Sequence, residues 1–332
     1  MDHETLAREL IRALRGRRSQ LALSRRLRLR SNVLYTWESG RRFPTAARFL
    51  HLAERVGIDV RAGMAAFLGA TPEALQTKPL SDPSSVAHLL THLAEGTTQV
   101  ELAVRVRKNR VSVGRWLKGQ AEPRLPDFLR LIEATSLRLL DFVAIFAAPQ
   151  ELPAARGAWS ELEAQRRVAY RLPWSHAVLR VLELEAYREL PRHEDGFVAE
   201  RLGISLGTER ECLAALAESK LIIKKKGRWT AGSVLTVDTR KNPEAGRALK
   251  AHWARVGEQR LPGLEPGGED LFSYNLFTVS EKAWVRLREM HIAYFQEIRR
   301  VIGDSSPAER VALANLQLFR LDESTRIETC VE

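Results

Sequence analysis

The sequence predicts a mainly α protein built from several domains, and three observations carry this prediction. Apolar residues recur at the three-and-four spacing of helices through most of the 332-residue chain. A pattern in residues 19–44 returns without a gap 79 residues later, as expected for a duplicated helical unit. Runs typical of β-strands begin only after residue 220, so we expect the strands in the C-terminal half.

Positive charge is concentrated at the N-terminal end of the chain. Over the whole sequence 52 Lys and Arg face 41 Asp and Glu, a formal net charge of +11. Residues 1–80 carry 15 basic and 7 acidic residues, whereas residues 159–332 carry 27 and 26. Eight arginines and no acidic residue lie between Arg12 and Arg30. This distribution favours a polyanionic partner, with nucleic acid as the leading class.

Composition disfavours several other classes of protein. The two cysteines, Cys212 and Cys330, provide neither a disulfide framework nor a zinc ligand set, and the histidines show no metal-ligand spacing. We therefore expect no metal and no cofactor. No apolar run is long enough for a membrane span or a signal peptide, so we expect no membrane contact and a cytoplasmic location. The excess of Arg over Lys indicates a GC-rich, bacterial genome.

The first unit, residues 1–70, reads as five helices. Residues 4–14 form an amphipathic helix, and residues 19–44 then read as a helix, a tight turn, a second helix and a stop at Pro44. This order is a helix-turn-helix. Thr45 is expected to cap the fourth helix, and residues 60–68 to form the fifth.

Residues 71–85, rich in Pro, Ser and Thr, are predicted to link this unit to a second copy at residues 86–148. The repeat includes the supporting helices as well as the motif, which makes it a duplicated domain. Its matching pairs are Gln20 and Gln99, Leu23 and Leu102, Trp37 and Trp116, Gly40 and Gly119, Pro44 and Pro123, Phe49 and Phe128, Leu50 and Leu129, Leu52 and Leu131, and Phe67 and Phe146. Both tryptophans are predicted to pack in a core.

The two units resemble the Cro-type (XRE-like) helix-turn-helix family of bacterial and phage repressors. In the first unit the resemblance rests on Gln20, Leu23, Ser24, Leu27, Arg28, Trp37, Glu38, Gly40 and Pro44. In the second it rests on Gln99, Leu102, Ala103, Val106, Arg107, Trp116, Leu117, Gly119 and Pro123. Two departures stand out: Arg28 and Arg107 occupy a turn position that favours a left-handed Gly, and Leu117 replaces the usual Glu. The resemblance implies a DNA-binding transcriptional regulator that inserts the second helix of each motif into the major groove.

Candidate DNA contacts lie at the start of each first helix, along each second helix and just behind it. In the first unit they are Gln20, Arg30, Ser31, Asn32, Tyr35, Thr36, Arg41 and Arg42. In the second they are Gln99, Lys108, Asn109, Arg110, Val111, Ser112, Arg115 and Lys118. Asn and Arg can pair bidentately with base edges, whereas Arg41, Arg42 and Lys118 are placed for phosphate. Because the two second helices differ, one chain is expected to prefer an asymmetric site on adjacent major grooves of double-stranded DNA.

An alternative from another functional class stays open. Helix-turn-helix folds also serve as protein-interaction modules, so the chain could be a scaffold or antitoxin-like regulator whose units bind a partner protein. The less charged second unit fits this alternative better than the first.

Residues 160–240 are predicted to form a winged-helix domain, entered through a second linker that ends near Gly157. A long amphipathic helix is expected from Trp174 to Leu190, then a further helix-turn-helix and two β-rich runs, LIIKKKGRW and SVLTVDT. Two carboxylates at the start of the recognition helix, Glu209 and Glu211, are expected to repel phosphate. The basic wing is a secondary candidate for DNA contact: Lys224, Lys225, Lys226 and Arg228.

A G-x-S-x-G sequence at Gly203–Gly207 matches the nucleophile elbow of serine hydrolases. That motif requires a preceding strand, whereas a helix is expected before Ser205. We therefore interpret it as the turn of the winged helix, assign no catalytic residue and expect no enzymatic activity.

Residues 241–332 are expected to form a small α+β domain for dimerisation or sensing. It contains a helix at 280–302 between strand-like runs, FSYNLFTV and VALANLQLFRL. Trp284, Leu287, His291, Tyr294, Ile298 and Val301 form one stripe of the helix, either a core face or the seam of a homodimer. The region from about 165 to 322 resembles a bacterial domain family of unassigned function found behind DNA-binding N-termini.

Overall fold

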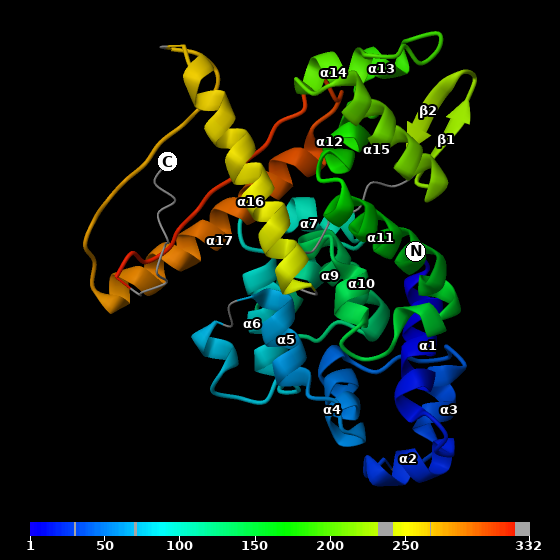
Figure 1. The fold of residues 1–332 in the computed structure, drawn as a ribbon. Helices are drawn as coiled ribbons and strands as arrows, with labels where there is room; N and C mark the ends of the chain where they lie inside the picture. Colours follow the sequence, from blue (N-terminus) through cyan, green and yellow to red (C-terminus); the bar gives the residue numbers. More distant parts are fainter. Residues whose placement is uncertain (30, 70–71, 232–241, 266, 323–332) are drawn as a thin grey trace.

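The computed structural model describes residues 1–332 except 30, 70–71, 232–241, 266 and 323–332. Its described part is mainly helical, and the strands within that part form one two-stranded sheet (Figure 1). The mainly α prediction is confirmed. Within the described residues, no helix combines the length and the apolar composition that crossing a membrane requires.

The first unit contains five helices, as its periodicity predicts. They are α1 (His3–Arg15), α2 (Gln20–Arg26), α3 (Val33–Glu38), α4 (Ala46–Val56) and α5 (Val60–Leu68). Polar side chains fix three of the starts: Asp2 accepts a hydrogen bond from the Glu4 amide, Ser19 from Ala22 and Thr45 from Arg48. The buried residues of α1 follow the helical repeat, with Leu6, Leu10 and Leu14 on one face.

The second unit repeats this plan. Its helices are α6 (Pro83–Leu93), α7 (Gln99–Arg105), α8 (Arg110–Leu117), α9 (Leu125–Ser136) and α10 (Leu139–Val143). Trp37 and Trp116, at equivalent positions, are 4% and 9% exposed, so both are core residues as predicted.

The segment predicted to link the two units packs on the core. It includes the 3₁₀ helix η1 (Glu73–Leu75), and Leu75 and Leu80 are buried. The Arg61 guanidinium donates hydrogen bonds to the carbonyl oxygens of Leu75, Gln76 and Lys78. The connection is therefore anchored by apolar contacts that its Pro- and Ser-rich composition conceals.

One hydrophobic core runs through both units and into the following helix. At its centre the Phe142 ring lies against Phe67, Phe128 and Phe146, with ring centroids 5.1–5.7 Å apart. These edge-on aromatic contacts join α5 and α9 to α10 and the turn behind it. The two units consequently form one packed body.

The predicted second linker is largely helical. After η2 (Pro149–Glu151), α11 (Pro153–Arg171) starts with Pro153, which is favourable in a first helical turn. The expected helix from 174 to 190 is divided into α12 (Trp174–Val181) and α13 (Glu185–Arg188). At the break the Glu185 amide donates to the carbonyl oxygen of Ala308, a long-range hydrogen bond that an unbroken helix could not make.

The winged segment continues with α14 (Phe197–Leu202), α15 (Leu206–Glu218) and the antiparallel strands β1 (Ile222–Lys225) and β2 (Arg228–Ala231). The described hairpin thus covers all of LIIKKKGRW except its first residue and continues to Ala231. The second β-rich run, SVLTVDT, lies outside the described residues. Lys226 and Gly227 form the turn, with φ of 49° and 81°, the left-handed pair that suits a two-residue hairpin loop.

The C-terminal part consists of α16 (Pro243–Arg260), η3 (Leu261–Gly263) and α17 (Glu281–Asp304). Figure 1 shows the chain between η3 and α17 as an arc that leaves the body, and the chain after α17 as a segment that returns along it. The strands expected in FSYNLFTV and VALANLQLFRL are absent from these described residues, so the α+β prediction is wrong here. The strands of the described part, β1 and β2, pair with each other, so neither segment has a described strand as a ladder partner.

Candidate nucleic-acid interface

Each unit turns sharply between its two motif helices through an arginine. Arg28 has φ 56° and Arg107 has φ 54°, so both adopt the left-handed conformation expected from the resemblance. A non-Gly residue in this region carries about 1 kcal/mol or more of strain. Both side chains are exposed, which places a positive charge at the corner where the second helix begins.

In the first unit, a buried carboxylate fixes the angle between the motif helices. Glu38, at the end of α3, is 4% exposed. The Arg15 Nε atom donates to its Oε1 at 2.5 Å, and the Gln20 Nε2 atom donates to its Oε2 at 2.8 Å. Gln20 is therefore a half-buried link between α2 and α3 rather than a free DNA-reading side chain. Sequence reasoning named Glu38 only as a family residue and did not expect this role.

In the second unit the two motif helices pack together without a buried carboxylate. Leu117 replaces the Glu, and Gln99 lies over Gly114 on α8 instead. A Cβ at Gly114 would approach Gln99 Oε1 to 2.9 Å. The glycine therefore provides the space that Gln99 occupies, and Gln99 is half-buried like Gln20.

In the first unit most of the predicted contacts on and behind α3 are exposed. These are Ser31, Asn32, Tyr35, Arg41 and Arg42. The Arg41 guanidinium lies 5.3 Å from the centroid of the Tyr35 ring, a cation–π contact that orients both toward one face. Thr36 is half-buried, and its hydroxyl donates to the Val33 carbonyl at 2.7 Å. Arg30 lies outside the described residues.

In the second unit Arg110, Val111, Arg115 and Lys118 are exposed along and just behind α8. Val111 is 72% exposed, an apolar side chain that fits contact with a thymine methyl group.

Three further predicted contacts of the second unit have structural partners. Asn109 caps α8, because its Oδ1 accepts from the Ser112 amide at 2.7 Å. Ser112 itself is half-buried. The Lys108 ammonium forms an ion pair with Asp127 at 2.9 Å, so part of its charge is neutralised. The structure thus separates Arg110 and Arg115, which point to solvent, from neighbours that hold the motif together.

In the winged segment the two acidic residues of the recognition helix differ in exposure. Glu209 is completely buried, and its carboxylate accepts from the Gly196 and Ala199 amides at 3.0 and 2.5 Å. It caps α14 from the protein interior, so contrary to expectation this carboxylate does not lie on the surface, where it could repel a phosphate. Glu211 is exposed.

The basic residues of the hairpin lie at its tip. Lys224, Lys225 and Lys226 are exposed, and Arg228 is half-buried. The Lys224 ammonium lies 5.5 Å from the Trp229 ring centroid. The hairpin is tied to the body by the Trp229 amide, which donates to Tyr187 Oη at 3.1 Å, and by the His193 amide, which donates to the Gly227 carbonyl at 2.9 Å.

Ser205, the centre of the G-x-S-x-G match, caps a helix. Its Oγ accepts from the Thr208 amide at 3.0 Å at the start of α15, and α14 precedes it. The local order is helix, turn, helix, as the winged-helix interpretation predicts.

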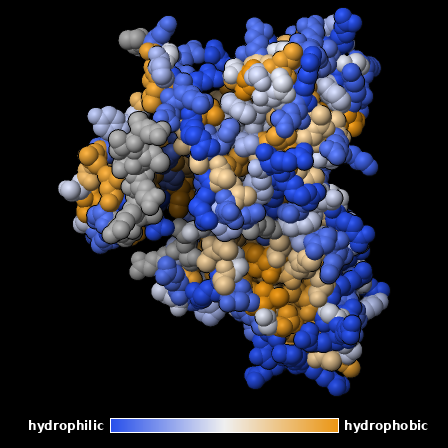
Figure 2. All heavy atoms as spheres, in the orientation of Figure 1, coloured by the Kyte–Doolittle hydropathy of each residue, from blue (hydrophilic) through white to orange (hydrophobic). Residues whose placement is uncertain are grey.

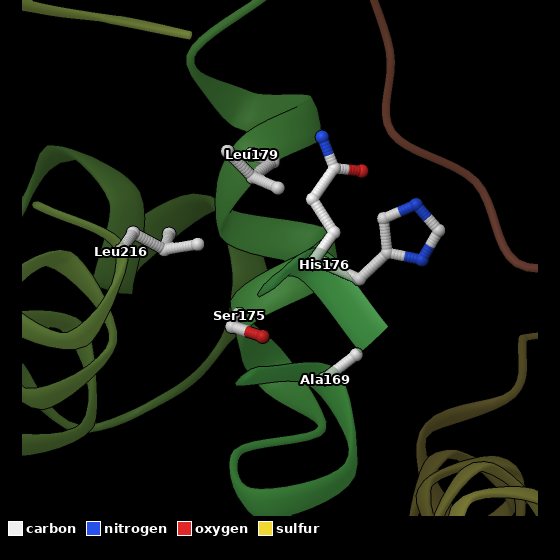
Figure 3. Close-up of a pocket in the computed structure, with 6 residues that line it drawn as sticks. Ala169, Ser175, His176, Leu179 and Leu216 are labelled. Atoms are coloured by element: carbon white, nitrogen blue, oxygen red, sulfur yellow. The ribbon is translucent and has the colours of Figure 1, made fainter. Parts of the chain in front are cut away.

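A pocket between α11, α12 and α15 is shown in Figure 3. It is lined by Gln165, Ala169, Ser175, His176, Leu179 and Leu216, and it has no space for a water-sized sphere. Burial, with a smaller effect of Arg180, lowers the pKa of His176 to about 4. Its Nε2 atom is buried without a hydrogen-bond partner. These features describe a packed histidine rather than a ligand site, and no metal-ligating cluster occurs among the described residues.

The C-terminal half matches a known family. A domain of unknown function, DUF4423, matches residues 153–321, from the start of α11 to the segment that returns along α17. The chain belongs to the DUF4423 family. The DUF4423 region therefore contains the winged segment, the pocket and the extended arc. No curated protein and no solved structure matches the chain.

Proposed function

We propose that this DUF4423 protein is a sequence-specific, double-stranded-DNA-binding transcriptional regulator with two Cro-type helix-turn-helix units. The observation that supports it is repeated in both units: a turn with an arginine at its corner, then a short helix with exposed polar or basic side chains at its start or along it. Arg28 with Ser31 and Asn32, and Arg107 with Arg110 and Arg115, supply it in the two units. Helices of this kind fit the major groove, where Asn and Arg read adenine and guanine.

The positive charge of the first unit supports the same proposal. Arg17, Arg18, Arg25, Arg26 and Arg28 are all exposed, whereas Arg15 is engaged by Glu38. Five exposed guanidinium groups around α2 supply the sequence-independent attraction that brings a protein to DNA. The first unit then contributes most of the phosphate binding, and the second more of the base discrimination.

Replacing Arg110 and Arg115 with Ala tests the proposal. Loss of two base-reading arginines is expected to weaken specific binding by at least about 2 kcal/mol, roughly thirtyfold. Fluorescence anisotropy with a selected duplex measures this affinity, and the R247S/K250S variant removes two exposed charges from α16 as a control. If the helix-turn-helix units bind a partner protein instead of DNA, the double variant and the wild type are expected to have the same affinity for the duplex.

We also propose that a second copy of the chain covers the C-terminal arc and α17. Fifteen large apolar side chains between Leu271 and Leu321 are 42–96% exposed, and Figure 2 shows apolar side chains on this protruding part. Together they expose an area on the order of 1,000 Å², comparable to one side of a standard protein interface. Residues 271–279 contain no charged residue.

The stripe on α17 fits the seam of such a homodimer better than a core face. Trp284, Leu287, His291 and Ile298 are only half-buried, and Tyr294 and Val301 are 51% and 57% exposed. An arc that leaves its own body beside a half-exposed helix is an arrangement that two identical chains can cover by exchanging arms. A dimer would also give the extended segments partners for their backbone groups.

A further inference from the structure

The contact between the two units is reciprocal. The Ala46 amide donates to the Pro123 carbonyl at 3.0 Å, and the Leu125 amide donates to the Pro44 carbonyl at 2.9 Å. Since residues 44 and 46 correspond to 123 and 125 in the repeat, exchanging the two units converts one hydrogen bond into the other. Thr45 and Arg124, also equivalent, form the antiparallel bridge between them. A head-to-tail repeat, in which different surfaces meet, does not produce this reciprocity.

The helices around this bridge follow the same rule. Helix α1 packs against α9, and α6 packs against α4, which is the same pair with the units exchanged. The equivalent helices α4 and α9 contact each other, as do α5 and α10. One pseudo-two-fold relation therefore accounts for the main contacts between the units, as in a homodimer joined into one chain.

Buried groups hold the two units in this pseudo-two-fold arrangement. The Arg138 guanidinium, on the second unit, donates to the Phe67 carbonyl of the first at 2.6 Å and lies over the Phe67 ring. The Phe49 and Phe146 rings meet with centroids 4.8 Å apart. Because this interface is continuous core rather than a tether, the orientation of α3 relative to α8 is set by packing.

We propose that the two units read two half-sites in opposite orientation, so that the DNA target is an inverted pair with non-identical halves. This inference rests on the proposed DNA-binding function and adds the geometry of the site. A two-fold reader matches the two-fold symmetry of duplex DNA, as in dimeric helix-turn-helix repressors. The halves differ because residues at equivalent positions of the two motifs differ: Ser31, Asn32 and the half-buried Thr36 against Arg110, Val111 and Arg115.

Selection from a random pool of duplex DNA with the full chain tests the orientation. The wild type is expected to enrich two different motifs that face each other on opposite strands. The R110S/V111N/R115T variant gives the second unit the residues of the first at three equivalent positions. Gly114 is left unchanged, because a side chain there would collide with Gln99. The variant is expected to enrich a palindrome whose two halves both match the first-unit motif, and to prefer it about tenfold over the wild-type site.

The reverse variant, S31R/N32V/T36R, is expected to enrich a palindrome whose two halves both match the second-unit motif. The control variant, R247S/K250S, is expected to enrich the wild-type site. Motifs in the same orientation, or a single motif, would overturn the inverted arrangement while leaving DNA binding intact. If the wild type enriches no sequence at all, the proposed function itself fails. Thermal unfolding of each variant shows whether a lost motif reflects a lost fold.

Discussion

Arg28 and Arg107 occupy the same turn position in the two units, and both hold a conformation that glycine adopts without strain. An arginine at this position lowers the stability of the fold, so its presence is favourable only if the positive charge contributes to function. Phosphate binding supplies that use under the proposed function.

Replacing Arg107 with Gly separates the two effects of this residue. Relief of strain is expected to raise the free energy of unfolding by up to about 1 kcal/mol, whereas loss of the charge is expected to weaken DNA binding. Chemical denaturation and DNA titration measure the two quantities. Arg107→Ala is the matched control, since it loses the same charge but keeps the strained φ; equal stability of the Gly and Ala variants would contradict the strain.

His176 makes stability depend on pH. Its pKa is about 4 in the folded protein, below the ordinary histidine value near 6.5, because burial disfavours the protonated ring. The unfolded chain therefore binds the proton more readily, and stability is full above about pH 6.5 and falls as the pH drops toward 4. The loss from this residue is at most about 3 kcal/mol. Denaturant unfolding between pH 4 and 7 should show a shallower pH dependence for His176→Gln; an unchanged slope would exclude His176 as the cause.

At the scale of elements, periodicity predicted the helices of both units, because each has one continuous buried face. Periodicity gave the wrong helix bounds where the apolar pattern continues although the chain changes direction. Leu182, Leu184 and Tyr187 are all buried, so the sequence reads as one helix across the break between α12 and α13. The break serves the hydrogen bond from Glu185 to Ala308, more than a hundred residues away, which local patterning does not encode.

The candidate interface was predictable in outline and less so by residue. The repeat located α3 and α8, and Arg110, Arg115, Arg41 and Tyr35 are exposed there. Spacing alone could not show that Gln20 and Lys108 are bound to carboxylates, since Glu38 and Asp127 reach them from other helices. Nor could it show that Glu209 is buried.

The arc before α17 leads to a prediction about the oligomeric state. Tyr274 and Leu276 are 96% and 76% exposed, and we expect them to pack against a second copy. The wild type, a chain of 37.5 kDa, should therefore elute at twice this mass in light scattering, and the Y274E/L276E variant as a monomer. A monomeric wild type at micromolar concentration would contradict the homodimer. Circular dichroism of the variant checks that its helices persist.

At the scale of the whole molecule, the two units share one core, so under the proposed function they act as a single DNA-binding body. Residues 71–85 were predicted only to link the two units, whereas the shared core fixes the orientation of α3 relative to α8. Little conformational entropy is then lost when the second unit binds after the first. The DUF4423 region adds α11, which packs against α1, so it also touches the reader directly.

Under this account, phosphate contacts from both units provide a large share of the binding free energy. The most direct test is the affinity of the full chain for a selected duplex as a function of salt concentration, measured by fluorescence anisotropy. About six phosphate contacts predict that the logarithm of the association constant falls linearly with the logarithm of the salt concentration, with a slope of about −5. An affinity that does not change with salt would contradict the proposal that this protein binds DNA.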